Sequence, residues 1–256
     1  MSLQVNYIMP FGTLIIGDEI LRGKRQDKHF AQVVVALNGR GLVLSWCEYL
    51  GDDPARITAT LARTLASDDI VFTFGGIGAT PDDHTRQCAA AAAGVPLMRH
   101  PEATAEIEAQ FGEAAYPKRI LMADLPQGSR IIPNPYNRIP GFSIKDHHFL
   151  PGFPDMAWPM MEWVLGTFYK HLFPVVPEIE QSIMVFDVGE SLLIDLMNDN
   201  IARFPQLKLF CLPSMPDQSG RRLELGVRGD VTLVPAAIDH LKKGVDALGY
   251  RWSEAL

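Results

Sequence analysis

A glycine-rich segment at residues 75–85, with the sequence GGIGATPDDHT, most restricts the folds open to this chain. It follows an apolar, strand-like run at residues 69–74 and precedes an alanine-rich, helix-like run at residues 87–93, which Gly94 ends. A glycine loop between the carboxyl end of a strand and the amino end of a helix offers free backbone N–H groups to an anion. The segment, called the glycine loop below, therefore indicates a site for a ligand such as phosphate.

Two interpretations of the acidic pair in the glycine loop stay open from the residues alone. Asp82 and Asp83 could complement the helix dipole, with Thr80 as the N-cap, Pro81 at the first helical position and Asp83 at capping-box spacing. Alternatively, two carboxylates beside a phosphate-sized nest require a divalent cation between them, because like charges repel. The loop matches neither GxGxxG nor a P-loop, since no lysine follows the glycines.

The bulk composition bounds the class of protein. At 256 residues with 47% hydrophobic residues, the chain can form one large domain, or one with a smaller second domain. The net charge of −7 argues against a nucleic-acid partner or an anionic membrane surface. The three cysteines lack a CxxC spacing, so reduced thiols are expected. No apolar run approaches the ~20 residues that span a bilayer, and no signal segment is evident, so we expect a cytoplasmic protein without a membrane partner.

Strand-like and helix-like runs alternate through the first part of the chain. The strand-like runs at residues 11–16, 42–50 and 69–74 each end at a glycine. This alternation predicts an α/β fold, a three-layer αβα arrangement with a mostly parallel sheet. Ligands of such sheets bind at the carboxyl ends of the strands. The acidic residues expected to gather at that edge are Asp18, Glu19, Asp52, Asp82 and Asp83.

The later part of the chain predicts a connection and a second domain. Residues 101–125 look helical, and the proline-rich residues 126–159 are either a long irregular connection or an ordered segment with a functional role. Pro174 marks a linker, so we expect domains at residues 1–173 and 174–256. The strand-helix-strand-strand-helix-strand order after the linker predicts a small, ferredoxin-like α+β domain.

The glycine loop resembles the GGxGxTxxDxT signature of the molybdopterin-binding, or molybdenum-cofactor biosynthesis, domain family. The doubled acid at residues 82–83 is most similar to the CinA-like (competence/damage-inducible protein) branch of that family. Other pieces match in the family's order, namely Gly17-Asp18-Glu19-Ile20-Leu21, Gly51-Asp52-Asp53, Pro133-Asn134-Pro135, Pro140-Gly141-Phe142, Leu150-Pro151-Gly152-Phe153-Pro154 and Gly189-Glu190-Ser191. The resemblance covers roughly residues 11–200 and implies the molybdopterin-binding fold. The chain lacks the length for the C-terminal amidohydrolase domain of many full-length CinA proteins, so that activity is not expected.

The resemblance also implies site residues. Asp83 and Asp52 are the candidate catalytic carboxylates, and Asp52, Asp82 and Asp83 are the candidate ligands of Mg²⁺ or another divalent ion, which takes oxygen ligands. The candidate ligand-binding residues are Gly75, Gly76, Gly78, Thr80, Thr85, Asp18, Asn134, Gly141, Pro151 and Gly152. Capping or back-bonding of a helix is the alternative role of the two threonines. Either Asp52 or Asp53 could instead be an N-cap ahead of Pro54.

The chain departs from the family pattern near the expected pocket. Where the family has PNPxGTAPGF, Asn137-Arg138-Ile139 replaces Gly-Thr-Ala, and the bulkier side chains are expected to narrow or re-specify the pocket. His29 and Met156 stand where the family has Asn and Glu. The adjacent histidines at residues 147–148 should point to opposite faces of a strand, so a joint metal site is not expected.

Three functions are compatible with these features. The first is a binding module for a phosphorylated pterin such as molybdopterin. The second is a metal-dependent nucleotide pyrophosphatase acting on ADP-ribose or a similar dinucleotide, in which Asp83 helps to activate water. The third is a catalytically silent regulatory or assembly protein. The resemblance also implies a homo-oligomer, a dimer first.

Overall fold

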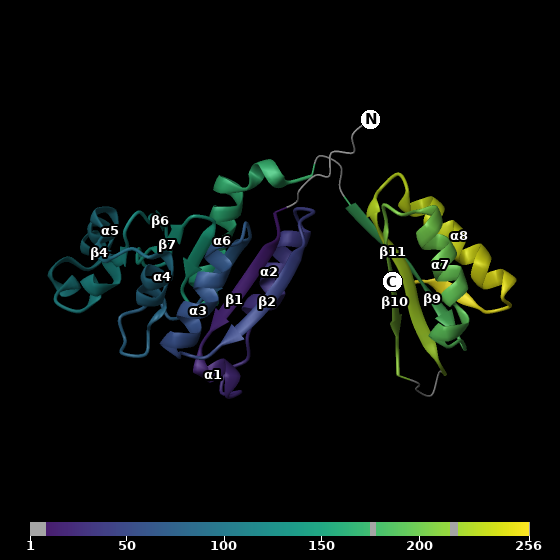
Figure 1. Cartoon of the computed structure of the whole chain (residues 1–256), viewed down its shortest axis with the longest axis horizontal. Helices are drawn as coiled ribbons and strands as arrows, with labels where there is room; N and C mark the ends of the chain where they lie inside the picture. Colours follow the sequence, from purple (N-terminus) through teal and green to yellow (C-terminus); the bar gives the residue numbers. More distant parts are fainter. Residues whose placement is uncertain (1–8, 175–177, 216–219, 256) are drawn as a thin grey trace. The chain divides into compact units, whose positions relative to one another are not determined.

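The computed structural model describes residues 9–174, 178–215 and 220–255. The chain divides into two compact units, Met1–Phe173 and Pro174–Leu256. The first unit, drawn from purple to green in Figure 1, contains the glycine loop. Across the described part of the chain, no helix has both the length and the apolar character needed to cross a membrane.

A six-stranded sheet forms the centre of the first unit, in the order β2-β1-β3-β8-β7-β6. β1 pairs in parallel with β2 and β3, and β8 pairs in parallel with β3, whereas β7 runs antiparallel to β8 and β6. The strands are β1 (Phe11–Ile16), β2 (Leu44–Leu50), β3 (Ile70–Phe74), β6 (Arg130–Ile132), β7 (Gly141–Ile144) and β8 (His147–Leu150). Every residue of β1, β3 and β8 is buried, as continuous apolar strands covered on both faces are.

Two hydrophobic cores lie on opposite faces of this sheet. One packs α2 (His29–Asn38) and α6 (Pro154–Phe168) against it, through side chains such as Val33 and Met160. The other includes side chains of α3 (Pro54–Leu65), α4 (Thr85–Ala93) and α5 (Pro101–Phe111). The three-layer αβα arrangement expected from the sequence is thus confirmed (Figure 1).

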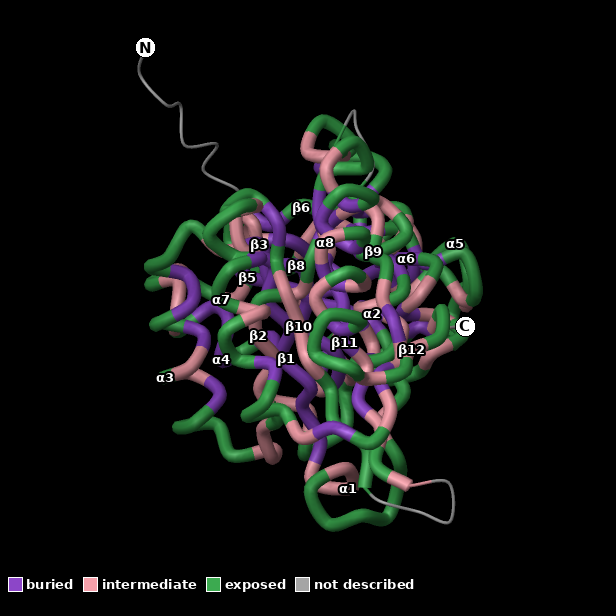
Figure 2. Tube along the Cα trace, turned by 90° about the vertical axis from the view of Figure 1, so that its right-hand side faces the viewer, coloured by how far each residue is buried: buried purple, intermediate pink, exposed green. Residues whose placement is uncertain are grey.

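Several local expectations were wrong in detail. The helix expected over residues 101–125 ends at Phe111, because Gly112 adopts a positive φ of 54°. It is followed by two 3₁₀ turns, η1 (Gly112–Ala115) and η2 (Arg119–Ala123). The proline-rich residues 126–159 are not an irregular connection but contain β6, β7 and β8, and β5 (Asp124–Pro126) pairs with β4 (Leu97–Arg99) just before them. A four-residue helix, α1 (Asp18–Leu21), follows β1, and the exposed loop after it is green in Figure 2.

The second unit is a four-stranded antiparallel sheet with two helices. Its elements are β9 (Glu178–Phe186), η4 (Glu190–Leu192), α7 (Ile194–Arg203), β10 (Lys208–Pro213), β11 (Arg222–Asp230), α8 (Val234–Ala247) and β12 (Trp252–Glu254). The sheet order β10-β11-β9-β12, with all neighbours antiparallel, is that of a ferredoxin-like α+β unit. Its core includes Leu193, Leu225 and Leu241, all fully buried. A 3₁₀ turn, η3 (Lys170–Leu172), closes the first unit ahead of it.

Candidate functional site

A cavity of about 880 Å³, called the main cavity below, lies at the carboxyl ends of β1, β3 and β8. Most of its wall comes from residues 16, 17, 19, 75–80, 82, 83 and 151–153, together with Asp52 and with residues near positions 24, 118 and 134. This is the edge of the sheet where parallel α/β folds bind their ligands. Its volume falls within the ~300–1,000 Å³ of typical small-molecule sites.

Glycine is required at the first two positions of the glycine loop. Gly75 and Gly76 have positive φ values of 102° and 68°. An added Cβ on Gly75 would lie 2.2 Å from the backbone oxygen of Ile16, and one on Gly76 would lie 2.3 Å from Thr85 Oγ1. Both glycines line the main cavity. Gly75 N already donates to the Leu150 oxygen at 3.0 Å, so the N–H groups that a ligand could approach are those that follow it in the loop.

Thr85 fixes the glycine loop from behind rather than lining the main cavity. Its side chain is fully buried, its hydroxyl donates to the Gly75 oxygen at 3.0 Å, and its N–H donates to the Gly76 oxygen at 3.0 Å. Thr85 therefore neither lines the cavity nor bonds back to its helix, and its hydroxyl instead supports the glycine loop.

The expected capping of α4 by Thr80 was wrong. The helix begins at Thr85, so residues 80–83 form a turn ahead of it. The Asp83 carboxylate oxygen Oδ2 accepts hydrogen bonds from Thr80 N at 3.0 Å and from the Thr80 hydroxyl, while Asp83 N donates to the Thr80 oxygen at 3.0 Å. No described residue donates to the other carboxylate oxygen of Asp83, Oδ1. That oxygen is available to a ligand or a cation at the cavity wall.

Asp52 and Asp18 connect the ends of β1 and β2. Asp18 N donates to Asp52 Oδ2 at 2.9 Å, and Asp52 N donates to Asp18 Oδ1 at 3.3 Å. Asp52 lines the main cavity, whereas Asp18 points to Arg22, at 2.7 Å. The N-cap ahead of α3 is Asp53, which accepts from Ala55 N at 2.9 Å, so Asp52 is free of that role.

The electrostatic surroundings of Asp52 are crowded with negative charge. Burial raises the pKa of its carboxyl group, and the charges of Asp18, Glu19 and Asp82 raise it further, against a hydrogen bond from Asp18 N. Asp52, Asp82 and Asp83, called the acidic wall below, all line the main cavity. Such a cluster gains from a bound cation, which would lower the repulsion among its members.

The acidic wall is not a ready-made metal cage. Among residues 9–174, 178–215 and 220–255, no three histidine, cysteine or acidic side chains are arranged to hold a metal ion. Mg²⁺ commonly binds through one or two carboxylates, several waters and the phosphates of a ligand. The acidic wall therefore fits a Mg²⁺ ion that arrives with its ligand better than a resident one.

Four cationic residues that sequence reasoning missed also line the main cavity. They are Lys24, Arg25, Lys118 and Arg119, called the basic wall below. Arg119 is held in place, because its Nη1 donates to the Ala114 oxygen at 2.7 Å and its guanidinium lies 4.9 Å from the Phe111 ring centre. In the described part of the chain, no carboxylate forms an ion pair with any of the four. The available signal was two Lys-Arg dipeptides in a chain of net charge −7.

The remaining predicted residues divide between the cavity wall and the sheet. Asn134, Pro151 and Gly152 line the main cavity, as do Gly75, Gly76, Gly78 and Thr80. Gly141 does not; it lies within β7, where an added Cβ would be 2.4 Å from the Phe149 oxygen, so its role is close strand packing. Asp18 and Thr85 likewise support the wall without lining it.

Comparisons with known proteins find a matching family model, similar sequences and a similar structure. A family model described as a probable molybdopterin binding domain matches residues 12–171. A CinA-like protein of Syntrophotalea carbinolica is 32% identical over 185 residues, which cover 69% of this chain and 45% of that protein. A CinA-like protein of Geobacter sp. (strain M21) is 28% identical over 236 residues, 89% of this chain and 55% of that protein. The chain thus spans about half the length of these curated relatives.

A solved structure is also similar to the first unit. The crystal structure of the protein CinA, of unknown function, from Thermoplasma acidophilum superposes with a TM-score of 0.56 at 27% sequence identity. The match covers 61% of this chain and 97% of that one.

Proposed function

Because the chain belongs to the family of probable molybdopterin binding domains, we propose that it binds a phosphorylated pterin or nucleotide together with a divalent metal ion. One observation carries the proposal: the glycine loop, the acidic wall and the unpaired basic wall all line the same main cavity. Phosphate groups would accept hydrogen bonds from the loop N–H groups and neutralise the basic wall. A cation between phosphate and the acidic wall would then balance the remaining charges.

The metal ion of this proposal would be held by Asp83 and Asp52, with Asp82 beside them. Asp83 Oδ1 has no donor among the described residues. Burial and, after it, the charges of nearby carboxylates raise the pKa of Asp52, and a cation would offset those charges. When bound, the ion would supply charge neutralisation and orientation of the phosphates. We expect Mg²⁺, because the acidic wall provides only oxygen ligands.

The second candidate function is hydrolysis of a pyrophosphate bond in a dinucleotide such as ADP-ribose. The position of Asp52 and Asp83 in the same cavity as the glycine loop and the basic wall favours it, because a carboxylate there could accept a proton beside the phosphates of a ligand. Asp52 or Asp83 would accept the proton of a water molecule that attacks phosphorus. The loop N–H groups and the basic wall would stabilise the negative charge on the departing phosphate, releasing AMP and ribose 5-phosphate.

The decisive experiment follows AMP release from ADP-ribose, FAD and NAD with Mg²⁺, Mn²⁺ or Co²⁺, with a chelator as control, alongside calorimetric binding of ADP-ribose. Asp83→Asn should abolish metal-dependent binding or turnover. The matched control is Asp53→Asn, which removes one charge next to Asp52 but retains an N-cap for α3 and does not line the main cavity.

The outcomes separate the candidate functions. Metal-dependent AMP release that Asp83→Asn abolishes would establish the hydrolase. Metal-dependent binding without turnover would support a binding module, and phosphorylated pterins would be titrated next. If Asp83→Asn left both binding and turnover at the level of Asp53→Asn, the assignment of the site would be wrong. If neither ADP-ribose nor a phosphorylated pterin bound, a silent regulatory role would be favoured.

A further inference from the structure

A second cavity of about 310 Å³, called the side cavity below, lies next to the main cavity. The two share Ile16, Glu19, Arg25, Gly152 and Phe153 among their lining residues, so the two cavities adjoin each other. A ligand could therefore place different groups in the two cavities.

Phe153 is the aromatic side chain at the junction of the two cavities. It is 57% exposed, and it belongs to neither hydrophobic core of the first unit. Burial of its ring therefore contributes little to folding, and the exposed ring face is available to a ligand.

The backbone that carries Phe153 is held on both sides. Met156 N and Ala157 N donate to the Phe153 oxygen at 3.1 and 2.9 Å, at the start of α6. The preceding Gly152 oxygen accepts from His29 Nε2 at 3.1 Å, and Gly152 packs against the glycine loop, where an added Cβ would lie 3.5 Å from Gly75 Cα. Phe153 is thus one residue from the contact with the glycine loop, on a fixed backbone that lowers the entropy cost of binding.

The side cavity is lined by both apolar and polar residues. Ile20 and Pro154 supply partly exposed apolar surface, whereas the lining residues Ile15 and Phe74 belong to the buried core. Glu19, Arg25 and Gln26 supply polar and charged groups for the edge of a ring. Ring faces stack on aromatic side chains, and ring edges are read by polar groups.

We propose that Phe153 is a stacking platform for the planar heteroaromatic ring of the ligand, whose phosphates lie against the glycine loop. This inference rests on the proposed function and assigns to one residue the recognition of the ligand's ring. The preferred ligand carries a ring joined to phosphate, a nucleotide or a pterin, and ring-free phosphates bind without using Phe153.

The test compares ligands with and without a ring by titration calorimetry in the presence of Mg²⁺. The probes are ADP-ribose, a pterin carrying a pyrophosphate group, and inorganic pyrophosphate. The variants are Phe153→Ala, Phe153→Leu and Phe153→Tyr, with Phe30→Ala as control, because Phe30 is an exposed aromatic residue of the same unit that lines neither cavity.

We expect Phe153→Ala and Phe153→Leu to weaken binding of the ring-bearing ligands by about 5- to 150-fold, the range of base stacking on an aromatic side chain. Phe153→Tyr should bind like the unmodified protein, and pyrophosphate affinity should change less than about twofold in every variant. If ADP-ribose loses more affinity, the ring that stacks on Phe153 is adenine; if the pterin loses more, it is the pterin ring.

Three results would overturn the inference. Equal losses for pyrophosphate and ring-bearing ligands would make Phe153 a wall of the phosphate site. Full retention of affinity by Phe153→Leu would indicate apolar filling without stacking, and no loss in Phe153→Ala would remove the platform altogether. If the unmodified protein bound none of the three probes, the proposed function would fail and this inference with it, a pattern distinct from the other three.

Discussion

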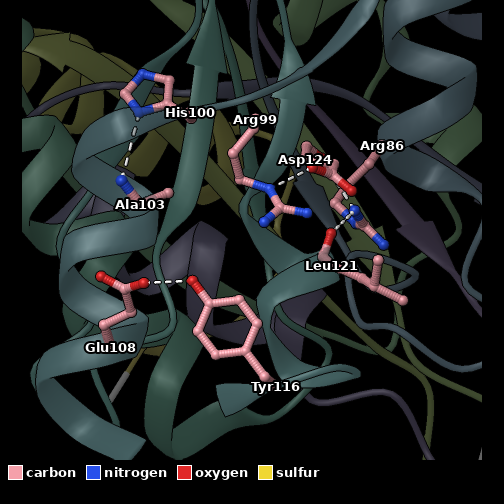
Figure 3. Close-up of polar contacts among 8 residues, drawn as sticks. All are labelled: Arg86, Arg99, His100, Ala103, Glu108, Tyr116, Leu121 and Asp124. Carbon is pink, nitrogen blue, oxygen red and sulfur yellow. Dashed lines mark hydrogen bonds and ion pairs between the residues drawn. The ribbon is translucent and has the colours of Figure 1, made fainter. Parts of the chain in front are cut away.

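Replacing Arg86 with methionine should destabilise the first unit by about 2–4 kcal/mol. Arg86 extends from α4 and is only 4% exposed. Its Nη1 donates to the backbone oxygens of Leu121 at 2.5 Å and Asp124 at 2.9 Å, and its Nη2 donates to that of Gly78 at 2.7 Å. Figure 3 shows the guanidinium beside Leu121 and Asp124. The side chain thereby connects the glycine loop to η2, which carries part of the basic wall.

The magnitude follows from two opposing contributions. Hydrogen bonds from a charged donor contribute about 1.5–3 kcal/mol each, so three of them amount to at least about 4.5 kcal/mol. The cost of burying the charge opposes this gain, and burial also lowers the pKa of the guanidinium. In addition, Arg86 Nε is buried without a partner among the described residues. Methionine removes that cost but leaves three carbonyl oxygens without their donor. The net loss is therefore smaller than the sum of the bonds.

Arg99→Met is the matched control, because Arg99 contacts the same residue at the surface. Its Nε lies 2.6 Å from Asp124 Oδ1, but its side chain is 42% exposed, so the expected loss is at most about 1 kcal/mol. Urea unfolding followed by tryptophan fluorescence in a Trp252→Phe background reports on the first unit alone, since the other three tryptophans lie there. Equal losses in Arg86→Met and Arg99→Met would refute the reasoning.

Two further predictions concern pH and backbone strain. Burial lowers the pKa of His147 to about 4 and that of His148 to about 3, from the ordinary value of 6.5. Each histidine therefore contributes its full stabilisation above pH 6.5. That contribution is lost as the pH falls toward the folded-state pKa. Between pH 7 and pH 5, the free energy of unfolding measured with urea should fall by about 1–2 kcal/mol per histidine. If it fell as much in His148→Gln as in the unmodified protein, the prediction would be wrong. Gly75→Ala should cost at least about 2 kcal/mol and abolish pyrophosphate binding, because its Cβ would meet the Ile16 oxygen at 2.2 Å. Gly94→Ala, at a positive φ of 68° with open space around it, should cost only about 1 kcal/mol in the same unfolding assay and leave binding intact.

The central strands could be predicted from the sequence, whereas the later ones could not. β1 and β3 are buried on both faces and read as continuous apolar runs bounded by glycine. β6, β7 and β8 have only three or four residues each, among prolines, and their positions depend on pairing with β3 across more than 70 residues of chain. Short strands with distant partners carry too little local pattern to be recognised.

The two walls of the main cavity also differ in how well their positions could be predicted from the sequence. The acidic wall follows the ends of β2 and β3, so the rule for parallel sheets predicted its position. The basic wall comes from the loop after α1 and from the start of η2, where no periodicity marks a functional face. The start of α4 was misplaced because Asp83 closes a turn with Thr80, which delays the helix to Thr85.

The replaced segment Asn137-Arg138-Ile139 changes the chemistry of the main cavity without closing it. Asn137 and Ile139 line the wall, yet about 880 Å³ remains, whereas Arg138 adopts a positive φ of 58° and pairs with a glutamate of α5. Asn134 Nδ2 donates to Asn137 Oδ1 at 2.8 Å, and Asn137 Nδ2 lies 3.5 Å from the sulfur of Met156, itself a departure from the family pattern. The two departures therefore contact each other and fix an amide at the cavity wall. A fixed amide selects ligands by hydrogen bonding, so this chain is expected to differ from its relatives in which ligand it prefers rather than in whether it binds one.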